Sequence, residues 1–287
     1  MIEFRPFSGG FGAEICGLKP SNPLPASLAQ LIVTGMDQYG ICLIRNNKAL
    51  KDEDHLALGR LLGPLMRQKM QQTVSKRGIR LSTDELIDVG NLDERGNIHS
   101  EDDPRRAFHK GNLLWHSDVT FDQKRATYSL LAAHLIPPVG GDTEFADMAG
   151  AYLALSRDLK EQISGLSAEH SIWYSRARSG MADVSPEIRE TRPPARHPLV
   201  NVNHRTGEKS LYLASHASHV VGLSKATGRD LLKMLTLHAT QTRFIHRHEW
   251  RVGDIMIWDN LKTMHRGVPF DDAKYPRDMR RVTVLEE

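Results

Sequence analysis

The sequence contains few cysteines, and this scarcity excludes several classes of protein. Among its 287 residues only Cys16 and Cys42 are cysteines. Two thiols cannot build the disulfide framework of a small secreted domain, nor a zinc cluster made of cysteine ligands. We therefore expect a protein of a reducing compartment, and the cytoplasm fits best.

Neither sign of charge dominates, and long hydrophobic runs are missing. The formal net charge is +3, which is too small to suggest a nucleic-acid partner, and no dense run of Lys and Arg is present. Every apolar run is shorter than the roughly 20 residues that a membrane-spanning helix needs. The start of the sequence lacks the basic and apolar regions of a signal peptide. We expect neither nucleic acid nor membrane as a partner.

The length and the ordinary composition favour a large globular domain. Hydrophobic residues make up 40% of the chain and charged residues 25%, both typical of a globular protein that buries a substantial core. No internal repeat is visible, and no stretch can be defended as a domain boundary. We predict a single domain over residues 1–287.

Short apolar runs between glycines and prolines predict many short strands. We expect strands over 41–45, 87–91, 128–133, 143–147, 197–202, 210–213, 244–250, 255–258 and 280–285. Helical spacing predicts helices over 27–36, 52–61, 149–166 and 224–240. In the last of these, the side chains expected to be buried are Leu231, Leu232, Met234, Leu235 and Leu237. This pattern favours a mostly β fold, a two-sheet jelly roll with peripheral helices.

Three polar segments are predicted to be loops. Residues 66–84 are rich in Lys, Arg and Gln, so they form either a solvated surface segment or a lid from which Arg67 or Lys69 faces an anionic substrate. Residues 93–111 form a long loop that leads directly to Trp115 and His116, as active-site covers often do. Residues 175–196 are interpreted as a surface excursion.

The most informative motif is a histidine and an aspartate two residues apart. In an extended segment His116 and Asp118 point to the same face, because the side-chain period of a strand is two. His265 is a plausible third ligand. Two imidazoles and one carboxylate leave three sites of an octahedron open, as in non-heme Fe(II) oxygenases. The alternatives are a structural histidine that bonds nearby backbone, and a Zn(II) hydrolase site.

Two arginines near the C-terminus accompany this motif. Arg277 and Arg281 are four residues apart, so on a strand both point to one face. A guanidinium group binds a carboxylate through two parallel hydrogen bonds. If both arginines face an apolar interior, they require anionic partners. The alternative is a basic cluster on the surface.

Several segments together resemble one family. They are Trp115-His116-Ser117-Asp118, Gly140-Gly141-Asp142-Thr143, Trp258-Asp259-Asn260, His265-Arg266-Gly267 and Arg277-x-x-x-Arg281. In order and spacing they are similar to the Fe(II)/2-oxoglutarate-dependent taurine / 2,4-dichlorophenoxyacetate dioxygenase family. The resemblance runs from the Gly-rich N-terminus to the last strand. Phe145-Ala146-Asp147-Met148 and the stretch 216–223 resemble the 2,4-dichlorophenoxyacetate (aryloxyalkanoate) branch more closely.

The resemblance implies a role for each matching residue. His116, Asp118 and His265 would bind Fe(II), while Thr143 and Arg277 would bind 2-oxoglutarate. The residues implied near the substrate are Arg281, Asn112, His216 and His219, with Lys69 a further candidate in a loop that departs from the family. For the two histidines, a purely structural loop is an equally open interpretation.

The implied reaction is hydroxylation of a small anionic substrate by O2. For an aryloxyacetate such as 2,4-dichlorophenoxyacetate, the products would be a phenol and glyoxylate, with succinate and CO2 formed from 2-oxoglutarate. Within the same fold, the alternatives are a taurine-type sulfonate or another small carboxylate. A non-catalytic metal-binding protein is the remaining alternative, and we also expect a homo-oligomer.

Overall fold

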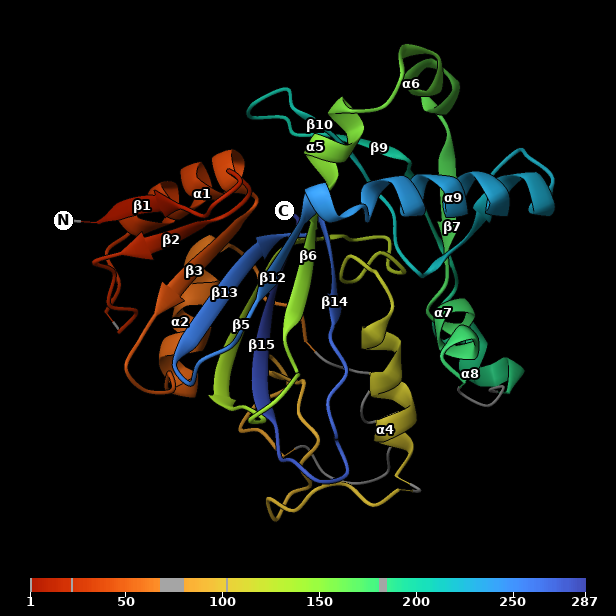
Figure 1. The fold of residues 1–287 in the computed structure, drawn as a ribbon. Coiled ribbons are helices and arrows are strands. Elements are labelled where there is room, and N and C mark those ends of the chain that lie inside the picture. Colours follow the sequence, from red (N-terminus) through yellow and green to blue (C-terminus); the bar gives the residue numbers. More distant parts are fainter. Residues whose placement is uncertain (1, 22, 68–79, 102, 181–184) are drawn as a thin grey trace.

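The computed structural model describes residues 2–21, 23–67, 80–101, 103–180 and 185–287. Its core contains two sheets in which most neighbouring strands are antiparallel (Figure 1). The larger sheet has the strand order β1-β2-β3-β13-β5-β15-β4. Its strands are β1 (Glu3–Pro6), β2 (Ala13–Cys16), β3 (Ile41–Arg45), β13 (Asp254–Asp259), β5 (Ala126–Leu135), β15 (Asp278–Leu285) and β4 (Ile87–Asp88). Among the described strands, only β2 and β3 pair in parallel. The smaller sheet has the order β12-β6-β14, with β12 (Ile245–His248), β6 (Thr143–Asp147) and β14 (Thr263–Gly267).

Side chains alternate between the two faces of the larger sheet. Leu130 of β5 and Val282 of β15 point outward and pack in a cluster with α1 (Ser27–Tyr39) and α2 (Asp52–Leu62). Their neighbours point the other way: Leu131 of β5 packs with Phe145 of the smaller sheet. Because the side-chain period of a strand is two, the same strands contribute side chains to the cluster with α1 and α2 and to the space between the two sheets. The two sheets therefore enclose an inner core, with α1 and α2 outside it.

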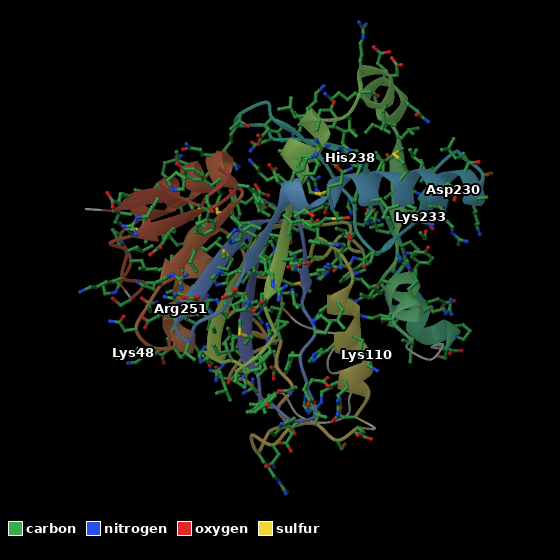
Figure 2. The ribbon with its side chains drawn as sticks, viewed as in Figure 1. Lys48, Lys110, Asp230, Lys233, His238 and Arg251 are labelled. Carbon is green, nitrogen blue, oxygen red and sulfur yellow. The ribbon has the colours of Figure 1, made fainter. Side chains whose placement is uncertain are left out.

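Helix α9 (Lys225–Ala239) and α5 (Met148–Leu153) share one apolar cluster with Ala146 and Met264 of the smaller sheet. His238, near the end of α9, lies beside α5 in Figure 2, and its Nε2 donates to the carbonyl of Ala151 at 2.9 Å. The predicted buried face was partly wrong, because Met234 and Leu237 are 39% and 62% exposed. Only one side of this helix faces the protein, and the leucine pattern extends beyond that side.

Two further small sheets and several short helices lie around this core. The sheets contain β7 (Ser167–His170), β8 (Ala195–Pro198), β9 (Val200–Val202), β10 (Lys209–Leu211) and β11 (Ala217–Val220). The short helices are α4 (Pro104–His109), η1 (Lys110–Leu113), α6 (Arg157–Ile163), α7 (Ile172–Arg178), α8 (Pro186–Glu190) and η2 (Thr242–Phe244). None of the helices in the described ranges combines the length and apolar content needed to cross a membrane.

Several predicted segments differ from the structure, among them the strand expected over 197–202, which is divided into β8 and β9. The helix expected over 149–166 is divided into α5 and α6, because the Ser156 hydroxyl accepts from Leu159 N and starts a new helix. The loop expected over 93–111 contains α4 and the start of η1. The segment 175–196, expected to be a surface excursion, contains the end of α7 and all of α8. Ile172 and Trp173 of α7 pack with Phe121 and with Ile188 of α8.

Candidate metal centre

Two distant segments are joined at the site by a short antiparallel bridge. The amide of His116 donates to the carbonyl of His265 at 3.0 Å, and the amide of His265 donates back at 2.8 Å. Directly opposed residues of an antiparallel pair project their side chains to the same side. The two imidazole rings accordingly lie with centroids 4.2 Å apart.

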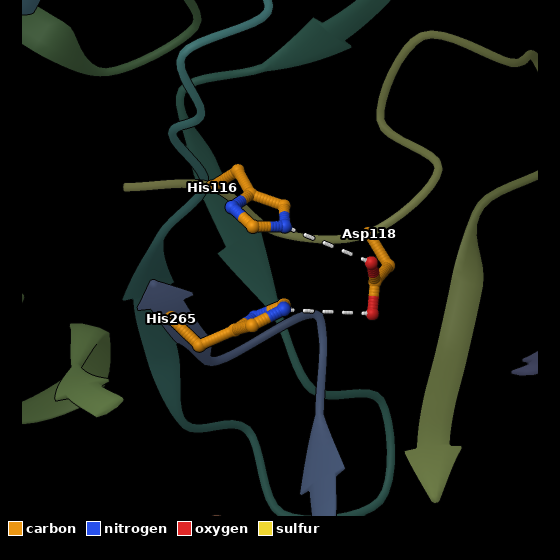
Figure 3. Close-up of side chains that lie close together, drawn as sticks. All are labelled: His116, Asp118 and His265. Carbon is orange, nitrogen blue, oxygen red and sulfur yellow. Dashed lines mark ion pairs between the residues drawn. The ribbon is translucent and has the colours of Figure 1, made fainter. Parts of the chain in front are cut away.

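Asp118, at the start of the turn that follows His116, completes the group (Figure 3). His116 Nε2 lies 3.9 Å from Asp118 Oδ1, and His265 Nε2 lies 3.8 Å from Oδ2. One ligand atom from each residue lies within 4.8 Å of the others. All three side chains are buried. Two imidazole nitrogens and a carboxylate oxygen thus converge on one point.

A set of buried hydrogen bonds fixes the Asp118 carboxylate. Ser129 Oγ of β5 donates to Asp118 Oδ2 at 2.8 Å. Asn260 Nδ2 donates to Ser129 Oγ at 3.0 Å, and Asn260 Oδ1 accepts from the Asp118 amide at 3.1 Å. Trp258 Nε1 also donates to Asn260 Oδ1, at 2.9 Å. The Trp258-Asp259-Asn260 motif therefore supports a metal ligand from behind, as outer hydrogen bonds do in metal sites.

The protonation states suit a divalent cation. His116 Nδ1 lies 2.7 Å from the Leu114 carbonyl and must donate to it, which leaves the Nε2 lone pair facing Asp118. Burial lowers the pKa of His116, against the opposing effect of Asp118, and lowers that of His265 well below its usual range. Burial alone would raise the pKa of Asp118, but Arg281 and the two histidines hold it at about 2. Neutral imidazoles and an ionised carboxylate are the forms that bind metal.

One cavity beside this centre is built around Arg277. It has a volume of about 250 Å³, and its lining includes His116, His265, Thr143 and Arg277. Arg277 donates to the carbonyls of Val89 at 2.8 Å and Gly141 at 3.3 Å. Its Nε has no hydrogen-bond partner among the described residues. Burial lowers the pKa of Arg277 to about 10, so the group is still protonated at neutral pH.

The hydroxyl group of Thr143 can donate a hydrogen bond within the same cavity. Trp250 Nε1 donates to Thr143 Oγ1 at 3.0 Å. Since this bond uses one lone pair of the oxygen, the hydroxyl hydrogen is available to an acceptor in the cavity. A buried cation and a hydroxyl donor together form a receptor for a small carboxylate.

A second cavity also adjoins the centre. Its lining includes Asp118, Phe121, Ile172, Arg176 and His216. Arg281 lines both cavities and donates through Nη1 to Asp118 Oδ1. The candidate metal centre therefore lies where the two cavities meet, and each cavity has an arginine of its own.

The structure also locates the remaining predicted substrate residues. Asn112 lines both cavities. His216 lines the second, with its Nδ1 3.0 Å from Thr120 Oγ1. His219 lines neither and instead contacts Ser218 Oγ at 2.9 Å. Lys69 lies outside the described residues, and Arg67 is exposed, 3.8 Å from Glu85.

Comparison with known families decides the classification. The family described as "Taurine catabolism dioxygenase TauD, TfdA family" matches residues 3–283. The chain belongs to this family. The family assignment made from the motifs is thereby confirmed.

Relatives in the TauD/TfdA family resemble the chain over most of its length. An alpha-ketoglutarate-dependent 2,4-dichlorophenoxyacetate dioxygenase of Cupriavidus pinatubonensis is 41% identical over 252 residues, covering 88% of this chain and 86% of the relative. An (S)-phenoxypropionate/alpha-ketoglutarate-dioxygenase of Delftia acidovorans is 34% identical, covering 97% and 93%. The crystal structure of AAD-2 in complex with Mn(II) and N-oxalylglycine superposes with a TM-score of 0.95 at 36% identity, covering 100% of this chain and 98% of that one.

Two residues of this TauD/TfdA site were missed by the sequence reasoning. Ser129 lies within a strand predicted from its apolar neighbours, and its hydroxyl gave no separate signal. Arg176 lies in a segment that was interpreted as a surface excursion, although it is 7% exposed and lines the second cavity. A signal for Arg176 was available in the preceding Ser171-Ile172-Trp173, a helix N-cap followed by two large apolar residues.

Proposed function

We propose that the chain is an Fe(II)- and 2-oxoglutarate-dependent dioxygenase that hydroxylates a small anionic substrate, with aryloxyacetates such as 2,4-dichlorophenoxyacetate as its substrate class. The observation that carries the proposal is the placement of His116, Asp118 and His265 between two arginine-bearing cavities. Relatives that act on 2,4-dichlorophenoxyacetate and phenoxypropionate support the substrate class. We further propose that residues 1–287 form one domain whose two facing sheets are a jelly-roll core.

The donor set fits Fe(II). Two neutral imidazoles and one carboxylate on one face are the set used by non-heme Fe(II) oxygenases, and they leave positions open for other ligands. His116 Nε2, His265 Nε2 and an Asp118 oxygen would hold the ion. Bound iron supplies the redox chemistry by which O2 is activated at the expense of 2-oxoglutarate.

The chain's own groups bind and orient the two organic molecules. Arg277 and Thr143 would bind the carboxylate of 2-oxoglutarate that lies away from the metal, since they form the polar end of the first cavity. Asn112, at the border of both cavities, would contact either molecule. The buried position of the centre keeps water away, which favours reaction at the substrate over side reactions.

The overall reaction balances with these components. Substrate, 2-oxoglutarate and O2 give hydroxylated substrate, succinate and CO2, so one oxygen atom enters each organic product. In an aryloxyacetate, hydroxylation of the carbon beside the ether oxygen gives a hemiacetal. This hemiacetal collapses to a phenol and glyoxylate without any further oxidant.

An assay of succinate formation tests the proposal. With Fe(II), 2-oxoglutarate and O2 present, 2,4-dichlorophenoxyacetate should stimulate succinate formation and release the phenol in equal amounts. Taurine and short alkanoates in the same panel test the alternatives within the family. A metal hydrolase would consume no oxygen, so an absence of iron-dependent oxygen uptake with every member of the panel would contradict the proposed activity.

A further inference from the structure

A third cavity lies behind strand β13, away from the candidate metal centre. It has a volume of about 520 Å³, and none of the described residues that line it also lines the first or the second cavity. Two consecutive residues of β13 separate the spaces: Trp258 lines the first cavity and Asp259 lines the third. This arrangement follows from the strand, because successive side chains point to opposite faces.

Asp259 presents a buried carboxylate to the third cavity. The residue is 3% exposed, and its Oδ1 accepts a hydrogen bond from the Leu261 amide at 2.8 Å. Among the described residues, that amide is the one hydrogen-bond donor that reaches the carboxylate. Burial raises the pKa of Asp259 to about 6, although the Leu261 amide and the charge of Lys262 oppose the effect. The group is therefore mostly ionised at neutral pH, and its second oxygen requires a donor.

The Lys and Arg side chains that line this cavity already pair with other carboxylates. The pairs are Lys262 with Glu208 at 2.5 Å, Arg205 with Asp37 at 2.6 Å and Arg125 with Glu286 at 2.6 Å. Each of these cations has an acidic partner at hydrogen-bond distance, while Asp259 has none. A ligand that completes the charge balance of the cavity is therefore positively charged.

The other polar groups of the cavity suit an ammonium ion. Ser210 Oγ donates to the Leu261 carbonyl at 2.7 Å, so its lone pairs are left to accept. Tyr128 Oη accepts from Arg205 at 3.0 Å and has a second lone pair. A transition metal is not favoured, because the convergent set of three His or carboxylate ligands in the described structure is the one at the metal centre. An ammonium group can instead be held by one carboxylate and neutral oxygen acceptors.

Apolar side chains complete the wall of the third cavity. They come from α1, α2, β9 and β15, and they are Val33, Leu62, Val202 and Leu285. A short alkyl chain in contact with them would be removed from water, which is favourable. The cavity thus combines one buried anionic group with an apolar surface.

We propose that the third cavity is a second ligand site, in which the Asp259 carboxylate binds the ammonium group of a small primary alkylamine. The apolar side chains contact the alkyl body of the ligand. The inference goes beyond the proposed dioxygenase function and does not depend on it. A carboxylate of the same size is excluded by charge, and a quaternary ammonium ion is disfavoured because it has no N–H group to donate to Asp259.

Saturation-transfer NMR on the full chain tests this site. The protein is loaded with N-oxalylglycine and with Zn(II), a diamagnetic ion that takes imidazole and carboxylate ligands, to keep the probes out of the metal centre and the first cavity. The probes are butylammonium, tetramethylammonium and butyrate at constant ionic strength. We expect saturable binding of butylammonium with a Kd of about a millimolar, reasonable for so small a molecule. The other two probes should bind at least about tenfold more weakly.

Asp259→Asn is the decisive variant, because it keeps an oxygen for the Leu261 amide and removes the charge. It should raise the Kd for butylammonium at least about tenfold, the size of a lost charge-assisted hydrogen bond. Asp230→Asn is the matched control: Asp230 is exposed on α9, is labelled in Figure 2 and does not line the cavity. It should leave the Kd unchanged.

Val202→Lys provides a second test that leaves Asp259 in place. Val202 lines the cavity and is 41% exposed, so a lysine there adds a competing positive charge without filling the core. It should also raise the Kd for butylammonium, and it decides the question if Asp259→Asn does not fold.

Several outcomes would overturn the inference. A wild-type protein that shows no saturable butylammonium binding overturns it, because the cavity would then hold water only. An unchanged Kd in Asp259→Asn, or in Val202→Lys if the first variant does not fold, places the ligand elsewhere. Equal affinity for butylammonium and tetramethylammonium removes the hydrogen bond to Asp259. None of these results bears on oxygen consumption, which tests the proposed activity separately.

Discussion

Ser129 donates a hydrogen bond of 2.8 Å to Asp118, and it thereby ties the carboxylate of the candidate metal centre to the central strand β5. The same hydroxyl accepts from Asn260 at 3.0 Å. Asp118 begins a turn in which the next residue, Val119, has a positive φ of 59°, so its own backbone segment is irregular. A regular, buried strand therefore supplies the rigidity that the ligand segment lacks.

Loss of this bond should weaken metal binding. We expect Ser129→Ala to raise the Kd for Mn(II), measured by electron paramagnetic resonance, about tenfold, since hydrogen bonds behind a ligand typically contribute 10- to 100-fold in metal affinity. Ser218→Ala removes a half-buried serine that bonds Glu169 and His219, and it should leave the Kd unchanged. Equal metal affinity in Ser129→Ala and wild type would show that the bond is dispensable.

Removal of a ligand should abolish the centre altogether. His116→Ala or Asp118→Ala should eliminate the charge-transfer band that anaerobic Fe(II) plus 2-oxoglutarate produces in such sites, and turnover should disappear with it. His219→Ala serves as the control, because this histidine lines neither cavity. A band of normal intensity in His116→Ala would remove that residue from the ligand set.

The cosubstrate requirement should depend on Arg277. Its buried guanidinium donates only to carbonyls in the described structure, and an anionic partner would replace weak neutral bonds by a charge-assisted pair. We expect Arg277→Met to raise the 2-oxoglutarate concentration for half-maximal rate at least about tenfold, the equivalent of about 1.5–3 kcal/mol. The control variant is Arg251→Gln. Arg251 is exposed and lies on the opposite side of the smaller sheet from Lys110 in Figure 2.

Stability should fall on mild acidification, partly through His55. This residue is fully buried, its Nε2 donates to the carbonyl of Leu130 at 3.0 Å, and burial lowers its pKa from 6.5 to about 4. Below pH 6.5 the unfolded chain takes up a proton that the folded chain refuses, so the free energy of unfolding decreases until about pH 4. The contribution is roughly 3 kcal/mol at most.

Urea unfolding at several pH values measures this effect. The variant His55→Gln keeps a donor for Leu130 but cannot titrate, so its free energy of unfolding should change less with pH than that of the wild type. His204 is exposed to solvent, so His204→Gln is the control variant. Identical pH profiles for His55→Gln and the wild type would contradict the assignment.

Local sequence patterns were sufficient to predict the strands that carry the site. The alternation in β5, β13 and β15 follows directly from the period-two pattern, because one side chain in two faces each core. The spacing of Arg277 and Arg281 likewise placed both at the first cavity. Helix α9 was located correctly, whereas its buried face was not, because burial depends on what packs against a helix.

The sequence by itself determined the residue types of the centre, the family and most of the strands, since these depend on motifs and short-range periodicity. Only the tertiary structure decided that His265 pairs with the backbone of His116, that Ser129 holds Asp118 and that Arg176 reaches Gly111. Each of these contacts joins segments that are not neighbours in the chain. Such contacts follow from sheet pairing and helix packing, which no local pattern of residues specifies.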